Sequence, residues 1–357
     1  MYEYSNIFIK NIYHMLTYVF KPLEKLDDRK MNIEESDNIH NLLAAILSVG
    51  ISMQLKHGLY REYITKSEDL SVIRGKIDLQ GTIRNRIGHK MKVSCEFDEL
   101  SENNIFNQIL KTTVMFLLKS EHVKDDVKSE LRKEMLYFSN VDVILPSSIK
   151  WQTLRFQRNN QLYRTLITIC QLVIDGMLLT TDEGEYELAD FVDDQKMCNL
   201  YEHFIFEYYK KHHSYLTTNA SIVPWNLDDK SDEGLGLLLP QMNTDITLSN
   251  KDNTKVLIID AKFYAHNTQV QYEKHSIHSG NMYQIFAYVK NKEYQLEGTG
   301  AEVSGMLLYA KTLDEVQPDV RGKIHGSSIA VRNLDLGQEF DKVKEQLDNI
   351  VKEYFDV

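Results

Sequence analysis

The chain of 357 residues contains few of the features that build crosslinked or membrane-embedded proteins. It has only three cysteines, which are far apart and show no metal-ligand spacing (Cys95, Cys170 and Cys198). They argue against a disulfide framework and suit a reducing compartment. No apolar run reaches the roughly 18–20 residues of a membrane span, and the N-terminus lacks a basic-then-apolar signal segment. We therefore expect a cytoplasmic protein.

The sequence also lacks a phosphate-binding loop and an excess of positive charge. No G-x-x-x-x-G-K-[ST] pattern occurs, because Gly75-Lys76 and Gly322-Lys323 are both followed by Ile. Any nucleotide dependence must therefore come from a partner. The formal net charge is −11, whereas phosphate neutralisation supplies most non-specific DNA affinity. If the protein acts on DNA, either local basic patches or another subunit must hold the DNA, and we favour the second.

What remains is the composition of a globular α/β protein, with 43% hydrophobic and 26% charged residues, long enough for two domains. Apolar periodicity predicts helices at 11–20, 41–59, 105–118, 124–137, 161–178, 197–211, 281–289 and 338–354, and strands at 60–65, 72–82, 93–97, 304–309 and 327–332. We place the domain boundary at 181–185. Residues 1–185 then form an N-terminal region with a small β-barrel-like part and a helical stalk. Residues 186–357 form a mixed sheet flanked by helices.

One segment of the second domain carries the pattern on which the functional prediction depends. Two apolar, β-branched runs flank a polar segment, which predicts a β-hairpin with its turn centred between Asp252 and Asn253. This register sets Asp245 directly opposite Asp260, where Cβ atoms are roughly 4.5–5.5 Å apart. Because strand side chains alternate between faces, Lys262 shares a face with Asp260.

Two acids and a lysine in an apolar strand are costly to bury unless they pair or bind a metal. The continuous apolar run Val256–Ile259 predicts a strand covered on both faces. A carboxylate pair there would repel, raising one pKa, unless a divalent cation bridges it. Pro240, the distant Asp245 and the terminal Asp260-x-Lys262 are similar to the PD-(D/E)xK nuclease pattern, with the proline displaced from the first acid. The alternative is an Asp–Lys ion pair on a solvated sheet face.

A basic run around Gly88 departs from the acidic balance of the chain. Its members are Arg84, Arg86, His89, Lys90 and Lys92. We expect an exposed loop that contacts nucleic acid or an acidic partner face, and the alternative is a solvated loop without a partner.

Four polar residues on predicted helices are candidates for supporting roles. Glu202 and Glu207 are five positions apart and cannot share one helix face well, so we expect one acid at the metal site and the other in solvent. The alternative is two surface acids. Gln284 and Tyr288 are spaced i and i+4, which could place an amide and a hydroxyl beside the site; a capping or core role fits equally well.

Three histidines follow the hairpin, at positions 266, 275 and 278. Their spacings match no tight zinc pattern, so we favour DNA-facing or hinge roles over zinc binding. Among them, His278 is our candidate for a contact with DNA or a partner.

Several segments together resemble one known family along essentially the whole chain. They are Asn11–Tyr18, Arg74–Asp78, Phe97–Glu102, Asn107–Lys111, Leu239–Asp245, Ile258–Tyr264, His278–Gln284 and Asn333–Gln338. In this order they resemble the McrC family, the nuclease subunits of McrBC modification-dependent restriction systems. Each segment alone is a weak signal, and the combination is specific.

The resemblance implies the partners and cofactors. An N-terminal region would dock on a hexameric AAA+ GTPase of the McrB type and stimulate its GTP hydrolysis, so that GTP acts only through the partner. That partner would recognise methylcytosine in double-stranded DNA, and cleavage would follow when complexes meet, bringing in a second copy of the chain. The C-terminal domain would be a PD-(D/E)xK endonuclease that uses Mg²⁺, with Mn²⁺ as a substitute.

The same resemblance assigns roles to individual residues. It makes Asp245 and Asp260 the metal-binding acids, Lys262 the catalytic lysine and the carbonyl of Ala261 a further metal ligand. Two other functions stay open. One is a non-catalytic adaptor that only activates the GTPase, and the other is a nuclease that cuts without partner or GTP. The intact acids and lysine disfavour the adaptor, because a scaffold has no need of buried acids.

Overall fold

The computed structural model describes residues 9–19, 23, 38–156, 161–180, 186–188, 194–227, 233–264, 269–271, 274–312, 314 and 316–356. The chain divides into two compact units. We call His40–Ala189 the inserted unit, because the sheet unit contains both Asp190–Val357 and the N-terminal residues up to Asp27. Among the described residues, no helix combines the length and apolar character that crossing a bilayer requires.

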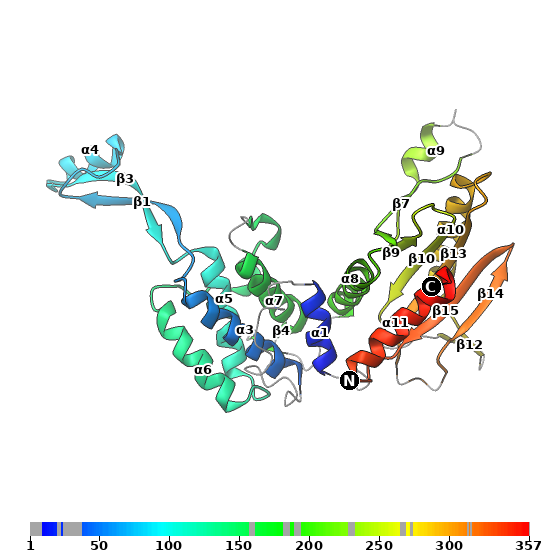
Figure 1. Ribbon diagram of the computed structural model, residues 1–357. Coiled ribbons are helices and arrows are strands. Elements are labelled where there is room, and N and C mark those ends of the chain that lie inside the picture. The colour runs from blue at the N-terminus through cyan, green and yellow to red at the C-terminus, as the bar shows by residue number, and fades with distance from the viewer. Residues whose placement is uncertain are drawn as a thin grey trace. The chain divides into compact units, whose positions relative to one another are not determined.

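The sheet unit is built on a six-stranded mixed sheet of order β14-β15-β13-β10-β9-β6. Its strands are β6 (Thr217–Asn219), β9 (Ile246–Ser249), β10 (Lys255–Lys262), β13 (Glu302–Ala310), β14 (Val320–Ile324) and β15 (Ser327–Leu334). The central strands β10, β13 and β15 are parallel, and β14, β9 and β6 join antiparallel to their neighbours. This arrangement confirms the predicted mixed sheet flanked by helices (Figure 1).

Helices bury the centre of this sheet. Helix α10 (Ser279–Gln295) packs on β10 and β13, and its Val289 belongs to the same buried cluster as Ile258. The two elements approach closely because β13 has a glycine: a Cβ at Gly305 would lie 2.6 Å from a methyl carbon of Val289. Helices α8 (Asp194–His212) and α11 (Phe340–Phe355) also contact β10. The strand is therefore buried from Val256 to Ala261, as its apolar run predicts.

The β9–β10 hairpin has the predicted register. Ser249 pairs with Val256 and Ile246 with Ile259, so the turn is centred between positions 252 and 253. Asn253 adopts a left-handed backbone conformation (φ 52°), which asparagine tolerates better than most residues. The ladder ends at Ile246, immediately after Asp245 and opposite the residue that precedes Asp260.

Smaller elements complete the sheet unit. They are the ribbon of β7 (Ile222–Val223) and β8 (Met242–Asn243), helix α9 (Glu233–Leu238), and the hairpin of β11 (Gln269–Gln271) and β12 (Lys274–Ser276). The β7–β8 ribbon leads directly into β9 and so determines how the chain enters the first acidic position.

We expected residues 1–185 to form one N-terminal region. The N-terminal helix α1 (Ile9–Val19) instead belongs to the sheet unit. The reason is a specific contact: the Asn11 amide donates to the carbonyl oxygens of Leu336 and Gln338, both at 2.7 Å. Helical periodicity locates the helix but carries no information about this long-range contact. The predicted boundary at 181–185 lies outside the described residues.

The inserted unit is mainly helical on both sides of its β-ribbon in the sequence. It contains α3 (Ile39–Leu55), α5 (Ile105–Lys119), α6 (Asp125–Met135), α7 (Gln161–Met177), the 3₁₀ turns η3 (Leu136–Phe138), η4 (Pro146–Ser148) and η5 (Trp151–Thr153), and the pair β4 (Leu178–Thr180) and β5 (Tyr186–Leu188). Helix α5 packs against both α6 and α7. The predicted helices of this region are all present, within a few residues at their ends.

A ribbon projects from these helices in the inserted unit (Figure 1). The strands β1 (Glu62–Leu70), β3 (Val93–Ser101) and β2 (Lys76–Ile77) form an antiparallel sheet of order β1-β3-β2. In the part of the chain that the structure describes, no pairing of β1 with β2 closes it into the predicted barrel.

The predicted strand at 72–82 is confirmed only at β2 (Lys76–Ile77), because helix α4 (Leu79–Ile87) begins within the predicted range. The Asp78 carboxylate accepts hydrogen bonds from the backbone N–H groups of Gln80 (3.0 Å) and Gly81 (3.1 Å), which caps the helix. The alternation of polar and apolar residues at 74–79 predicted a strand, and this cap overrides it. The basic run therefore begins on a helix and not in a loop.

Candidate functional site

Asp260 is a fully buried carboxylate at the end of β10. Its exposed fraction is 0%, and its Oδ2 lies 2.7 Å from Nζ of Lys262. Apart from this ion pair, neither oxygen accepts a well-formed hydrogen bond from the described residues. Buried carboxylates are normally hydrogen-bonded, so Oδ1, which has no hydrogen-bond partner among the described residues, is available to a further ligand.

Asp245 reaches the same place from the neighbouring strand. It stands immediately before β9, and its Oδ2 accepts a hydrogen bond of 2.8 Å from the backbone N–H of Ala261. In an extended strand, the N–H and C=O of one residue point toward the same neighbouring strand. The carbonyl of Ala261 is therefore directed toward the side of β10 on which Asp245 lies.

The protonation of the two acids reflects their burial. Burial and repulsion from Glu202 raise the pKa of Asp245 to about 6, against the hydrogen bond from Ala261. Burial and repulsion from Asp245 raise the pKa of Asp260 to about 7. Burial alone would lower the pKa of Lys262, but attraction to Asp260 outweighs it and leaves that pKa raised. The lysine is therefore a cation, and the acids compete for protons in the absence of another positive charge.

The structure separates the two candidate glutamates of α8. Glu202 is half-buried, and burial and the nearby Asp260 raise its pKa while His203 lowers it. Glu207 instead forms an exposed pair with Lys210, at 3.5 Å on the same helix. Glu202 therefore interacts electrostatically with the acid pair, whereas Glu207 is paired with Lys210.

Gln284 and Tyr288 both lie beside the lysine, one turn apart on α10. Nζ of Lys262 donates to Oε1 of Gln284 at 3.2 Å, and Nε2 of Gln284 donates to the hydroxyl of Tyr288 at 2.8 Å. Lys262 is thus held between the amide and the carboxylate of Asp260. The amide oxygen of Gln284 therefore helps to hold the ammonium group beside Asp260.

The residues present fit a divalent cation. Two carboxylates and a backbone carbonyl are hard oxygen ligands of the kind that Mg²⁺ and Mn²⁺ bind, and Mg²⁺ usually keeps several waters beside one or two carboxylates. A cation would offset the repulsion that raises the pKa of Asp260. No group of three or more His, Cys, Asp or Glu side chains within the described ranges is arranged to hold a metal by itself. The candidate set therefore depends on the Ala261 carbonyl and on water.

The other predicted contact residues belong to different units of the chain. Arg84 and Arg86 are exposed on α4, and Lys90 is exposed just beyond it, all in the inserted unit. His278 is the residue preceding α10, and its ring centroid lies 5.2 Å from that of Tyr264. Residue 266 and the side chain at position 275 lie outside what the structure describes.

The sequence patterns do not single out Thr244, which precedes the first acid. It is buried, and its hydroxyl accepts a hydrogen bond of 2.9 Å from the backbone N–H of Ser221. One signal was available: the PD-(D/E)xK pattern places proline at this position, and here it holds a hydroxyl residue.

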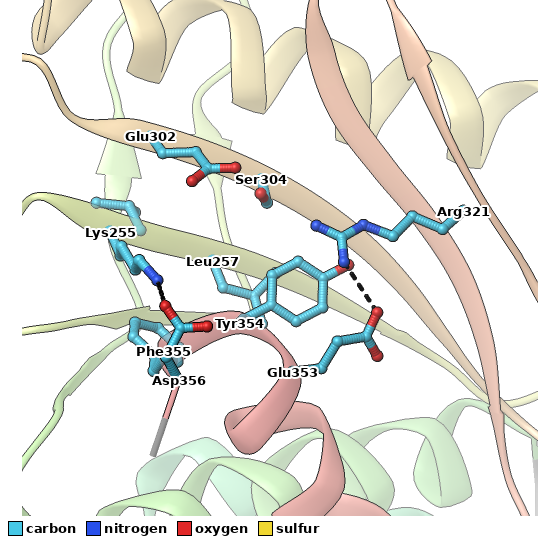
Figure 2. A pocket seen from close by; sticks show the side chains of 10 residues that line it. Lys255, Leu257, Glu302, Ser304, Arg321, Glu353, Tyr354, Phe355 and Asp356 are labelled. Atoms are coloured by element: carbon cyan, nitrogen blue, oxygen red, sulfur yellow. Dashed lines mark hydrogen bonds and ion pairs between the residues drawn. The ribbon is translucent and has the colours of Figure 1, made fainter.

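A cavity of about 290 Å³ lies at the other end of β10 (Figure 2). It includes Lys255, which hydrogen-bonds Asp356, and the ion pair of Arg321 with Glu353 at 2.9 Å. Lys255 and Asp260 are five residues apart on an extended strand, which corresponds to roughly 16 Å. This cavity is therefore separate from the acid pair, and four of its charged groups form two ion pairs, Lys255 with Asp356 and Arg321 with Glu353.

Comparisons with known proteins agree on one family. Residues 6–310 match the family described as the McrBC 5-methylcytosine restriction system component. The chain is 28% identical over 348 residues to the type IV methyl-directed restriction enzyme EcoKMcrBC of Escherichia coli strain K12, covering 97% of each sequence.

Two solved structures from Thermococcus gammatolerans are also similar. One is a chain of the refined half-complex from a tetradecameric assembly of McrB AAA+ hexamers with bound McrC (TM-score 0.52, 18% identity, 95% of this chain and 75% of that chain). The other is a chain of the cryo-EM structure of the McrBC complex (TM-score 0.41, 19% identity, 59% of this chain and 60% of that chain). At this identity the first likeness establishes a shared fold.

Proposed function

Because the chain belongs to the family of McrBC 5-methylcytosine restriction system components, we propose that it is the DNA-cleaving subunit of a GTP-dependent, type IV restriction complex. The observation that carries this proposal is the convergence of Asp245, Asp260 and Lys262 at one buried end of the sheet. Burying one acid beside a second acid costs folding free energy, and a bound cation would offset that cost.

In the proposed reaction the side chains position a DNA phosphate and supply charge. Asp245, Asp260 and the carbonyl of Ala261 would hold Mg²⁺ or, as a substitute, Mn²⁺. When bound, the cation polarises the scissile phosphodiester and lowers the pKa of the attacking water. The ammonium group of Lys262 stabilises the negative charge that develops on the phosphate oxygens. Gln284 on α10 accepts a hydrogen bond from that ammonium and holds it beside Asp260, and Glu202 would bind water at the edge of the metal site.

Docking on the partner is assigned to the tip of the inserted unit. Leu79, Ile83 and Ile87 are spaced by four residues along α4 and form one apolar face, and each is more than half exposed. Residues 74–92 hold six Lys or Arg and one Asp, although the chain as a whole carries a charge of −11. A basic and apolar tip fits an apolar, acidic surface on an AAA+ GTPase.

The relatives suggest which GTPase this is. The solved assembly pairs McrC with McrB AAA+ hexamers, and we assign a hexamer of that type as the partner that binds GTP and grips methylated DNA. The chain then stimulates its GTP hydrolysis. One site of this kind cuts one strand, so double-strand cleavage takes a second copy of the chain.

The test uses two variants that differ in their expected effect on GTP hydrolysis, assayed with the partner, GTP, Mg²⁺ and methylated plasmid. Asp260→Ala should lose DNA cleavage and keep GTPase stimulation. Ile87→Glu should lose GTPase stimulation, and cleavage with it. Leu136→Glu is the matched control, because Leu136 is 74% exposed and Ile87 75%, both in the inserted unit.

The outcomes separate the competing functions. If Asp260→Ala still cuts, the site assignment is wrong. If the wild-type chain stimulates GTP hydrolysis without any cleavage, it is an adaptor. If the purified chain alone cuts DNA without partner or GTP, it is an independent nuclease.

A further inference from the structure

Thr244 joins two parts of the fold at the point where the first acid must be placed. Upstream, β7 and β8 form a two-stranded ribbon, in which Ile222 pairs with Asn243. Downstream, Ile246 pairs with Ile259 in the six-stranded sheet. Thr244 and Asp245 lie between these two ladders. The chain passes from one sheet to the other at these two residues, so their backbone is not fixed by either ladder alone.

A set of hydrogen bonds fixes this crossing. The backbone N–H of Thr244 donates to the carbonyl of Ser221 at 2.9 Å, and the N–H of Ser221 donates to the Thr244 hydroxyl, also at 2.9 Å. The hydroxyl in turn lies 3.1 Å from the Ser221 carbonyl and 2.9 Å from the hydroxyl of Thr247. Thr244 is buried, with an exposed fraction of 3%. We call the bonds between Thr244 and Ser221 the clasp.

The geometry points to Thr244 as a positioning residue for Asp245, and this inference rests on the proposed nuclease function. The clasp holds the residue before Asp245, the Ile246–Ile259 pair holds the residue after it, and Ala261 holds its carboxylate. All three restraints together leave the carboxylate one orientation, toward β10. Positioning of this kind is required because a metal-binding acid must be placed to within about 0.5 Å.

The clasp also explains why this chain has Thr-Asp where the nuclease pattern has Pro-Asp. Proline restricts the backbone at this position through its ring and has no N–H. Here the N–H of Thr244 is used, and the side-chain hydroxyl supplies a second anchor to the same residue, Ser221. Hydrogen bonding therefore replaces ring geometry, and restoring the proline would remove both anchors.

The test measures metal binding by the purified chain without turnover, by titrating Mn²⁺ and following its electron paramagnetic resonance signal. Thr244→Val keeps the side-chain shape but removes the hydroxyl. We expect it to weaken Mn²⁺ binding about 10- to 100-fold, the usual effect of losing a residue that orients a metal ligand. Thr244→Ser should bind Mn²⁺ close to wild type. Thr244→Pro should bind at least as weakly as Thr244→Val.

Thr247→Val is the matched control, because it removes a hydroxyl from the same cluster and leaves the clasp intact. Its Mn²⁺ affinity should be that of the wild type. In the complete complex, Thr244→Val should raise the Mg²⁺ concentration for half-maximal cleavage by the same factor and recover most of its rate at saturating Mg²⁺. If Thr244→Val is unstable, Thr244→Ser compared with Thr244→Ala gives the same measurement.

Wild-type Mn²⁺ affinity in both Thr244→Val and Thr244→Pro would overturn the positioning role, provided that Asp260→Ala abolishes binding. An Asp260→Ala variant that binds Mn²⁺ and cuts DNA normally would instead overturn the nuclease site itself. The two failures are therefore distinguishable from one set of proteins.

Discussion

The backbone N–H of Ala261 donates to Oδ2 of Asp245 at 2.8 Å, which ties the first acid to the peptide unit that follows the second. The backbone contacts of the sheet thus bring the two acids together without a bound ligand. Burial and, to a smaller extent, repulsion from Asp245 raise the pKa of Asp260 to about 7. The folding energy of the sheet therefore holds two like charges close together, in an arrangement that a divalent cation would relieve.

The two glutamates of α8 give a direct comparison. Glu202→Gln removes a half-buried acid beside the pair, and we expect cleavage to fall about tenfold, a common cost of losing an outer ligand of a metal site. Glu207→Gln alters only the exposed pair with Lys210 and should cut at the wild-type rate. Single-turnover cleavage in the full complex measures both. The reverse order of effects would move the supporting role to Glu207.

Gln284 provides a test of how the lysine is aimed. Gln284→Ala removes one of the two groups that contact Nζ of Lys262, and we expect kcat to fall about 10- to 100-fold with little change in DNA binding. Gln295→Ala, at the exposed end of the same helix, is the control and should be neutral. Cleavage rates and DNA affinity are measured separately. A loss confined to DNA affinity would contradict the aiming role.

The raised pKa of Asp260 predicts how the stability of the metal-free protein depends on pH. Between the ordinary value of 3.8 and about 7, the folded chain keeps a proton that the unfolded chain releases. Stability therefore falls as the pH rises through this window. Asp260→Asn removes the effect, so it should stabilise the protein near pH 8 by about 1–3 kcal/mol and be neutral near pH 4.

Calorimetric melting with a chelator present measures this difference at the two pH values. Adding Mg²⁺ near pH 8 should raise the melting temperature of the wild type and leave that of Asp260→Asn nearly unchanged. A stabilisation by Asp260→Asn that is the same at both pH values would contradict the assigned protonation.

Asn11 anchors the N-terminal helix to the sheet unit. Asn11→Ala leaves two carbonyl oxygens, of Leu336 and Gln338, without this donor in a buried place, and we expect a loss of about 1–3 kcal/mol in stability. Lys10→Ala breaks the exposed ion pair with Glu339 and should cost less than about 1 kcal/mol. Denaturant unfolding gives both values. Equal effects would show that the amide has no special role.

The hairpin and its register were predictable because they depend on neighbours in the sequence. Polar turn residues and alternating side chains fix the register of β9 on β10, and the register brings Asp245 to Asp260. Other features depend on contacts that no local pattern encodes. The cap at Asp78 turned a predicted strand into a helix, and the choice of Glu202 over Glu207 depended on where α8 crosses the sheet. Likewise, the role of Thr244 depends on Ser221, which is distant in sequence.

The sheet unit takes its first helix from one end of the chain and the rest from the other, with the inserted unit between them. Helix α1 packs on α8, where the ring of Tyr18 meets that of Phe204 at a centroid distance of 5.4 Å. Trimming the gene from its start would therefore leave an incomplete fold with an uncovered aromatic surface. The core of the sheet unit is thus closed by two segments that the inserted unit separates in the sequence, and a fragment that begins after α1 would lack part of its own packing.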